Sequence, residues 1–194
     1  MIFRQLYEPV SSTYTYLLGC EETGRAVLID PVINSVERDL AEVSKLGLKL
    51  EYTLDTHIHA DHITSARELK QKAGSKIAAP AMDCLPCTDV GVEEGRPFQV
   101  GRLSFQPIHT PGHTDGHFAY RLDDRIFTGD ALLIEVAGVV EAAVEAFTGL
   151  GARLERRDPG FADPAPFCPP GPPFGPDARS APTVGRIGEK SASR

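Results

Sequence analysis

The stretch "DTHIHADHIT" at residues 55–64 contains half of the chain's six histidines together with two aspartates. The other histidines lie in a second short stretch, "IHTPGHTDGH" at residues 108–117, and none precedes residue 57 or follows residue 117. Imidazole nitrogens and carboxylate oxygens are the ligands of divalent metals such as zinc and iron. Two clusters of this composition predict a metal site.

The first cluster directly follows "LKLEYTLDT" (48–56), which has the composition of a buried β-strand. In a loop after a strand, His57 and His59 can both face one cavity. Asp61 and His62 are expected at the start of the next helix, where an aspartate can also accept hydrogen bonds from free backbone amides.

The second cluster offers one further ligand, and a third loop offers another. His113 lies in the turn "TPGHTDG" after a predicted strand, and Asp130 lies in "TGD" at the end of the strand 125–130. Residues at the ends of strands can converge on one rim of a sheet. His117 is a weaker candidate, and His109 is interpreted as a packing residue or as one that orients the ligands.

The remaining pattern of the first 130 residues predicts an α/β (α+β) fold in which a sheet is layered against helices. Residues 13–20 and 25–30 predict a hairpin, and residues 34–47 predict a helix that ends near Gly47. A second helix is expected from Ile63 to Ala73, with Ile63, Ala66 and Leu69 on one side. The other predicted strands are 75–80, 103–110, 117–124 and 125–130.

The composition changes after residue 134. Residues 136–151 have apolar side chains at helical spacing, and nine of the sixteen prolines lie at 159–182. Proline at that density prevents regular helix or sheet. We therefore expect a metal-binding domain at 1–134, an atypical helix–strand segment at 135–156 and an irregular tail at 157–194.

Charge and cysteine content narrow the class of protein. A net charge of −7 argues against nucleic-acid binding, which needs clustered Lys and Arg. No stretch has the length of a membrane span, and the N-terminus lacks the features of a signal peptide, so we expect a cytoplasmic protein. The four cysteines are too scattered for a disulfide framework. Cys84 and Cys87 form "CLPC", for which a solvated loop is favoured over a zinc or redox role.

The motifs "THIHADH", "TPGHTDG" and "FTGDALL" resemble the successive ligand motifs of the metallo-β-lactamase superfamily. Within that superfamily, the chain most resembles the persulfide dioxygenases of the ethylmalonic encephalopathy protein type. Further similarity lies in "SSTYTYLL" (11–18) and "VLIDPV" (27–32). The resemblance covers residues 1–134, whereas residues 135–164 look more like a segment of the amidase-signature enzymes.

The resemblance implies an αββα sandwich that is incomplete in its C-terminal half. It implies one Fe(II) bound by His57, His113 and Asp130, which also form the two-histidine, one-carboxylate set of non-haem iron oxygenases. His59, Asp61 and His62 would then orient the ligands or occupy a second metal position. The implied reaction in sulfur metabolism uses O2 to oxidise glutathione persulfide to sulfite and glutathione. The resemblance is also compatible with a homodimer.

Two other functions stay open at this point. One is a zinc hydrolase of the hydroxyacylglutathione hydrolase type, whose chemistry usually employs two bridged metal ions. A complete second metal site would need a later histidine, and no histidine follows His117. The other is a truncated chain that binds metal without turnover.

Overall fold

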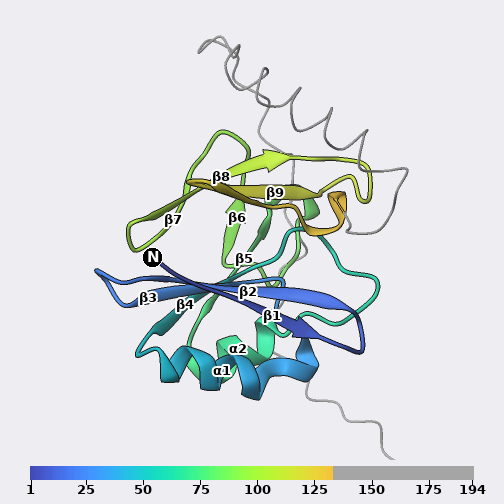
Figure 1. Cartoon of the computed structure of the whole chain (residues 1–194). Coiled ribbons are helices and arrows are strands. Elements are labelled where there is room, and N and C mark those ends of the chain that lie inside the picture. Colours follow the sequence, from blue (N-terminus) through green and yellow to red (C-terminus); the bar gives the residue numbers. More distant parts are fainter. Residues whose placement is uncertain (133–194) are drawn as a thin grey trace, which may run out of the picture.

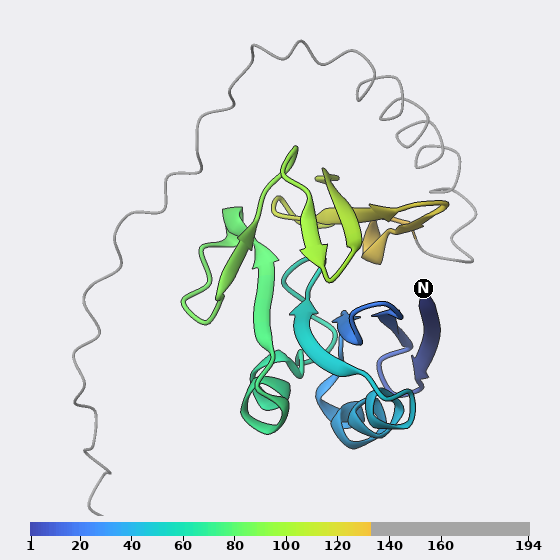
Figure 2. The ribbon, with the colours of Figure 1, turned by 90° about the vertical axis from the view of Figure 1, so that its left-hand side faces the viewer.

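The computed structural model describes residues 1–132 as two stacked β-sheets, with two helices packed against the outer face of the larger sheet (Figures 1 and 2). The larger sheet has the strand order β1-β2-β3-β4-β5-β6, and the smaller has the order β10-β9-β8-β7. The larger sheet comprises β1 (Ile2–Glu8), β2 (Thr13–Cys20), β3 (Arg25–Ile29), β4 (Lys49–Leu54), β5 (Lys76–Pro80) and β6 (Val90–Val92). The smaller comprises β7 (Phe98–Val100), β8 (Leu103–His109), β9 (Phe118–Leu122) and β10 (Arg125–Phe127).

Most of the predicted elements are present. Strands β2 and β3 form the expected antiparallel hairpin, while β3, β4, β5 and β6 run parallel to one another. The first predicted helix is α1 (Val36–Lys45), preceded by the short 3-10 helix η1 (Ile33–Ser35). It ends as expected, because Gly47 has a φ of 66° and its amide donates to the carbonyl of Ser44.

The prediction for residues 63–73 is wrong at its start. The helix α2 runs from Ala66 to Ala73. Residues before it are extended instead, since Thr64 forms an isolated β-bridge with Val32, and the amide of Ile33 donates to the carbonyl of Ile63. Ile63 is consequently 70% exposed, whereas Ala66 and Leu69 are buried as predicted. Three strands, β1, β6 and β7, were not predicted.

Alternation along the central strands divides the core into two layers, because successive side chains of a strand point to opposite faces. Leu18 and Ile29 face the smaller sheet, in a cluster that contains the buried rings of Phe105 and Tyr120. Leu17 and Leu28 face the helices, in a second cluster. Both faces of β2 and β3 are therefore covered, which explains their nearly continuous apolar sequences. These layers are α, β and β of the expected αββα order.

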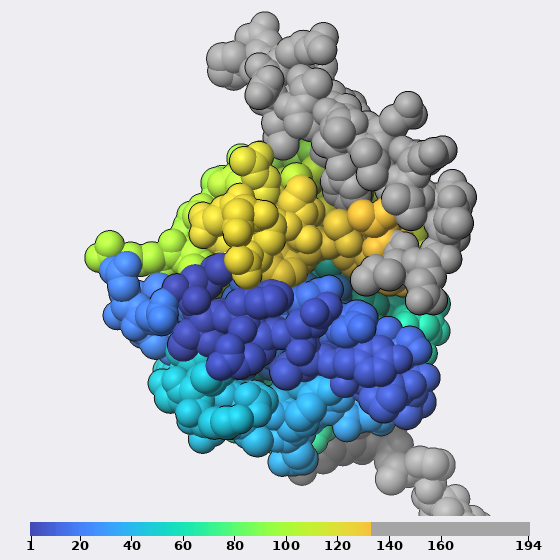
Figure 3. All heavy atoms as spheres, viewed as in Figure 1, coloured from blue at the N-terminus to red at the C-terminus, as the bar shows by residue number. Residues whose placement is uncertain are grey.

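The topology brings several loops to one edge of the two sheets. Strand β3 ends directly before Asp30, and its parallel neighbour β4 ends directly before Asp55. The sheets are joined there by two hydrogen bonds of 2.8 Å: the Phe118 amide donates to the Thr56 carbonyl, and the Tyr120 hydroxyl donates to the Asp55 carbonyl. Figure 3 shows the atoms of the N-terminal strands of the larger sheet (blue) against those of the smaller sheet (yellow) on the face seen in Figure 1.

Two other expectations can be compared with the structure only in part. Within residues 1–132, no helix combines the length and the hydropathy needed to cross a bilayer. The expected segments 135–156 and 157–194, and the expected incompleteness of the sandwich, lie outside the described residues.

The buried Asp39 of α1 generates a prediction about pH and stability. Its carboxylate pairs with Arg38 at 2.8 Å, but burial outweighs this contact and raises the pKa of Asp39 to about 6. Because the folded state keeps this proton to a higher pH than the unfolded state does, the free energy of unfolding falls as pH rises from about 4 to about 6. Asp39→Asn is expected to remove about 2 kcal/mol of this fall between pH 4 and pH 7, measured by urea unfolding.

Glu37→Gln is the matched control for this prediction. It changes the same charge on the same helix, but the Glu37 side chain is 81% exposed. Its pH profile should follow the parent profile. If the free energy of unfolding of Asp39→Asn and of the parent protein depended on pH in the same way, the raised pKa of Asp39 would be contradicted.

Candidate metal centre

Three loops at the shared edge bring together His57, His113 and Asp130. His57 follows β4, His113 lies in the loop between β8 and β9, and Asp130 lies in the short 3-10 helix η3 (Gly129–Ala131) after β10. One potential ligand atom from each residue lies within 4.8 Å of the other two. Asp130 Oδ2 is 3.7 Å from His57 Nε2 and 3.5 Å from His113 Nε2.

These separations suit a divalent metal ion. Two ligand atoms that are each about 2.1 Å from an ion lie about 3.0 Å apart at a right angle and about 3.4 Å apart at the tetrahedral angle. His57 Nε2 is buried and has no hydrogen-bond partner among the described residues. Burial, followed by the positive charge of His59, lowers the pKa of His57 to about 4. His57 is therefore neutral at physiological pH and has a lone pair available for an ion.

A chain of hydrogen bonds fixes which nitrogen of His57 has the lone pair. Asp30 accepts from both the amide and the hydroxyl of Thr56, at 2.7 and 2.9 Å. Since the hydroxyl proton is directed at Asp30, the Thr56 oxygen accepts from His57 Nδ1, which lies 2.9 Å away. His57 then has its proton on Nδ1, and Nε2 faces the candidate metal position.

A second cluster of potential ligands adjoins the first. His59, Asp61 and His62 also have ligand atoms within 4.8 Å of one another. His59 Nε2 lies 3.2 Å from Asp30. Burial alone would lower the pKa of His59, but the hydrogen bond and the charge of Asp30 outweigh it and raise the pKa to about 9. His59 is thus cationic at neutral pH in the structure.

Asp61 and His62 do not lie where the sequence predicts. Helix α2 begins at Ala66, so neither residue is in its first turn, and Asp61 caps no helix. Asp61 Oδ2 instead lies 3.1 Å from His62 Nδ1, and both side chains are within hydrogen-bonding distance of the Thr13 hydroxyl. The extended residues 63–64 displace the helix start and leave this pair in the loop.

The two remaining histidines behave differently from each other. His109 Nε2 donates to the carbonyl of Asp115 at 2.8 Å, which links the end of β8 to the loop that follows it. His117, a weaker candidate in the sequence, is fully buried, and its ring stacks on that of His57 with centroids 4.8 Å apart. The burial of His117 could not be predicted from the sequence pattern. It lies just before β9, and the ring that covers it belongs to a distant loop.

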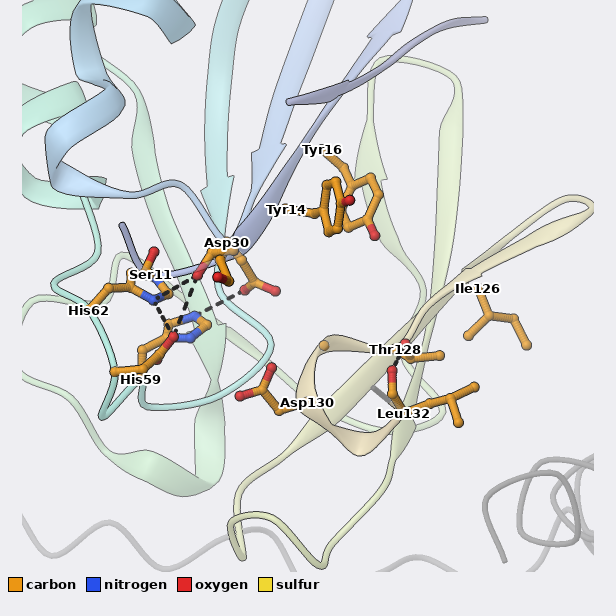
Figure 4. A pocket seen from close by; sticks show the side chains of 14 residues that line it. Ser11, Tyr14, Tyr16, Asp30, His59, His62, Ile126, Thr128, Asp130 and Leu132 are labelled. Carbon is orange, nitrogen blue, oxygen red and sulfur yellow. Dashed lines mark hydrogen bonds and ion pairs between the residues drawn. The ribbon is translucent and has the colours of Figure 1, made fainter. Parts of the chain in front are cut away.

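One cavity of about 610 Å³ is lined by His59, Asp61 and His62 of the second cluster and by Asp130 of the first. Asp30, His59 and His62 lie on one side of it, and Asp130 lies on the facing loop (Figure 4). Hydroxyl and aromatic side chains just before β2 and in its first residues also line the cavity: Ser11, Ser12, Thr13, Tyr14 and Tyr16. The potential metal clusters among residues 1–132 contain no cysteine.

The fold and the site identify the class of protein. The sequence model of the metallo-beta-lactamase superfamily matches residues 9–181 of this chain. The chain therefore belongs to the metallo-beta-lactamase superfamily. The fold is that of the superfamily, as the resemblance in the sequence predicts.

Particular relatives include enzymes of two kinds. The chain is 42% identical over 146 residues to the mitochondrial persulfide dioxygenase ETHE1 of Bos taurus, covering 71% of this chain and 55% of the relative. It is 38% identical over 127 residues to the hydroxyacylglutathione hydrolase of Rhodospirillum rubrum, covering 63% and 49%. The chain thus spans about half the length of the curated relatives it matches.

A solved structure is similar to the same region. The crystal structure of ETHE1 from Myxococcus xanthus is 50% identical to this chain and superposes with a TM-score of 0.67, covering 69% of this chain and 59% of the other. Its sequence identity exceeds that of the curated relatives named above.

Gly129, which precedes Asp130, generates a prediction about metal binding. Its φ is 48°, and a Cβ at this position would lie 2.5 Å from the Thr56 hydroxyl and 3.0 Å from His117 Nε2. Gly129→Ala must therefore displace either Thr56 or the turn that bears Asp130. We expect at least about tenfold weaker zinc binding, as for other changes that misorient ligands, measured by competition with a chelating dye.

Gly74→Ala provides the control. Gly74 has a similar φ of 70° at the end of α2, but a Cβ there meets no atom within 4 Å. Both variants bear the cost of a left-handed alanine, about 1–2 kcal/mol, and only Gly129→Ala should lose zinc affinity. Equal zinc affinities in the two variants would refute the role assigned to Gly129.

Proposed function

We propose that the chain is a persulfide dioxygenase that uses one non-haem Fe(II) ion and O2 to oxidise glutathione persulfide to sulfite and glutathione. The observation that carries the proposal is the set of His57, His113 and Asp130, whose ligand atoms lie within 4.8 Å of one another. Two imidazoles and one carboxylate are typical of Fe(II) oxygenases that leave positions open for O2 and substrate. The similarity to persulfide dioxygenases at 40–42% identity supports this choice of activity.

The metal ion would supply the redox chemistry, which zinc cannot do because its oxidation state does not change. In the overall reaction the terminal sulfur of the persulfide is oxidised, O2 is reduced, and water supplies the third oxygen of sulfite. His57, His113 and Asp130 would contribute two neutral donors and one negative charge. A divalent ion bound there would retain a net positive charge, which favours an anionic persulfide sulfur.

The neighbouring residues would prepare this site rather than take part in the oxidation. Asp30 and Thr56 direct Nε2 of His57 toward the ion. Because His57 is buried, its side of the site would exclude water from a bound ion. The hydroxyl and aromatic side chains of Ser11, Ser12, Thr13, Tyr14 and Tyr16 would offer hydrogen-bond partners and apolar surface to the organic part of the substrate.

One observation favours a second candidate, a two-zinc hydroxyacylglutathione hydrolase. The cluster of His59, Asp61 and His62 adjoins the first cluster and offers three further ligands. Against this candidate, the hydroxyacylglutathione hydrolase of Rhodospirillum rubrum is 38% identical to this chain, below the 40–42% of the persulfide dioxygenases. His59 is also engaged by Asp30. We therefore prefer the single-metal function.

A third candidate is a chain that binds metal without turnover. Its basis is the division proposed for the sequence, in which 1–134 form the metal-binding domain and 135–156 and 157–194 differ from the related enzymes. The homodimer and the cytoplasmic location remain predictions of the sequence.

Metal analysis combined with an oxygen electrode distinguishes these functions. The purified protein, reconstituted anaerobically with Fe(II), should contain about one iron per chain and consume O2 when glutathione persulfide is added, with sulfite as product. Two tightly bound zinc ions with cleavage of a hydroxyacylglutathione would instead establish the hydrolase. Stable metal binding with neither reaction would establish the third candidate.

His113→Ala and His109→Ala form a matched pair that tests the ligand assignment. Each removes one imidazole, from the last residue of β8 or from the loop that follows it, but only His113 lies with His57 and Asp130. His113→Ala is expected to lose most of the bound iron and O2 uptake, whereas His109→Ala should retain the iron. Retention of iron by His113→Ala would show that the ligand set is wrong.

A further inference from the structure

His117 contacts all three segments that bear the candidate ligands, although it is not one of them. Its ring stacks on His57, and its Nδ1 lies 2.7 Å from the hydroxyl of Thr110, in the loop that bears His113. Its Nε2 lies against Gly129, where an added Cβ would be only 3.0 Å away. The side chain is fully buried at this junction.

The stack constrains the orientation of His57. The planes of the two rings are 25° apart, with centroids separated by 4.8 Å, so the rings face each other. Rotation of an imidazole about χ2 is otherwise broad, and it changes the direction of the Nε2 lone pair. Thr56 fixes Nδ1 of His57, and the flat surface of His117 limits rotation of the whole ring about that hydrogen bond. Together they determine where Nε2 points.

The hydrogen bonding of His117 shows that its shape, more than its polarity, is used. Nε2 is buried and has no hydrogen-bond partner among the described residues. Leaving a buried polar atom without a partner costs about 1–3 kcal/mol. If hydrogen bonding to Thr110 were the only use of this side chain, a residue without the unpaired nitrogen would be more stable here. Nδ1 alone is bonded, and that bond orients the ring between His57 and Gly129.

We propose that His117 is a positioning residue that holds His57 and the Gly129–Asp130 turn in the arrangement that one divalent ion requires. The inference rests on the metal site of the proposed function, but it does not depend on persulfide oxidation. It adds a residue to the site that neither the ligand motifs nor the cavity wall includes.

Cobalt(II) is a suitable probe, because the wavelength and intensity of its visible absorption depend on the positions of its ligands. In the full chain, His117→Asn retains an amide that can bond to Thr110 and removes the stacked ring. We expect Co(II) affinity to fall about tenfold or more. We also expect the spectrum of the fully loaded variant to differ from that of the parent, which a mere loss of stability would not cause.

Val43→Ala controls for stability. Val43 is buried between α1 and the larger sheet, in the cluster away from the site. This variant should be less stable than the parent and should show the parent's Co(II) spectrum at saturation. If His117→Asn does not fold, Thr110→Val serves in its place, because it keeps the ring and removes only its hydrogen bond. A smaller spectral change is expected for it.

The outcomes separate this inference from the proposed function. If the parent protein binds no Co(II), the metal site itself is wrong, and the inference falls with it. If the parent binds Co(II) but the spectrum and affinity of His117→Asn match the parent, only the positioning role is overturned. An unchanged spectrum in Thr110→Val would overturn that role in the same way.

Discussion

The hydrogen bonds of Thr56 are the interactions on which the rest of the site depends. Its amide and hydroxyl donate to Asp30, which joins the ends of β3 and β4, and its carbonyl accepts from Phe118, which joins the two sheets. The same hydroxyl accepts from His57. One residue thus links the larger sheet, the smaller sheet and the first candidate ligand. Because each of these bonds is buried, losing one would leave a polar group unpaired at a cost of about 1–3 kcal/mol.

This arrangement explains why ligands from distant parts of the sequence can be placed accurately by loops. His57, His113 and Asp130 lie on turns, which are usually less rigid than strands. Here the turns directly follow β4, β8 and β10. Buried side chains of these three strands pack in one hydrophobic cluster between the sheets. His117 fills the space among the three turns. The site is therefore held by packing beneath it as well as by hydrogen bonds around it.

The sequence predicted the parts of this structure that depend on local pattern. Two β-prone segments, 13–20 and 25–30, indicated the hairpin of β2 and β3, and histidines after strands indicated the edge where the site lies. The start of α2 was missed because Thr64 pairs with Val32, a contact between residues far apart in the sequence. The role of His117 was underestimated for the same reason: only the tertiary structure shows that its ring reaches His57. Local pattern cannot reveal such contacts, because it does not specify which loops meet.

Two histidines of the same sequence motif have different pKa values in the structure. His57 and His59 are two positions apart, and their rings lie 4.2 Å from each other. Burial lowers the pKa of His57 to about 4, whereas Asp30 raises that of His59 to about 9. Asp30 is linked to His57 by hydrogen bonds through the hydroxyl of Thr56, but it contacts His59 directly. A single buried carboxylate therefore has two effects: it orients one imidazole as a neutral donor, and it keeps the next one charged. The difference in pKa arises because burial and the charge of His59 dominate at His57, whereas the direct hydrogen bond and charge of Asp30 dominate at His59.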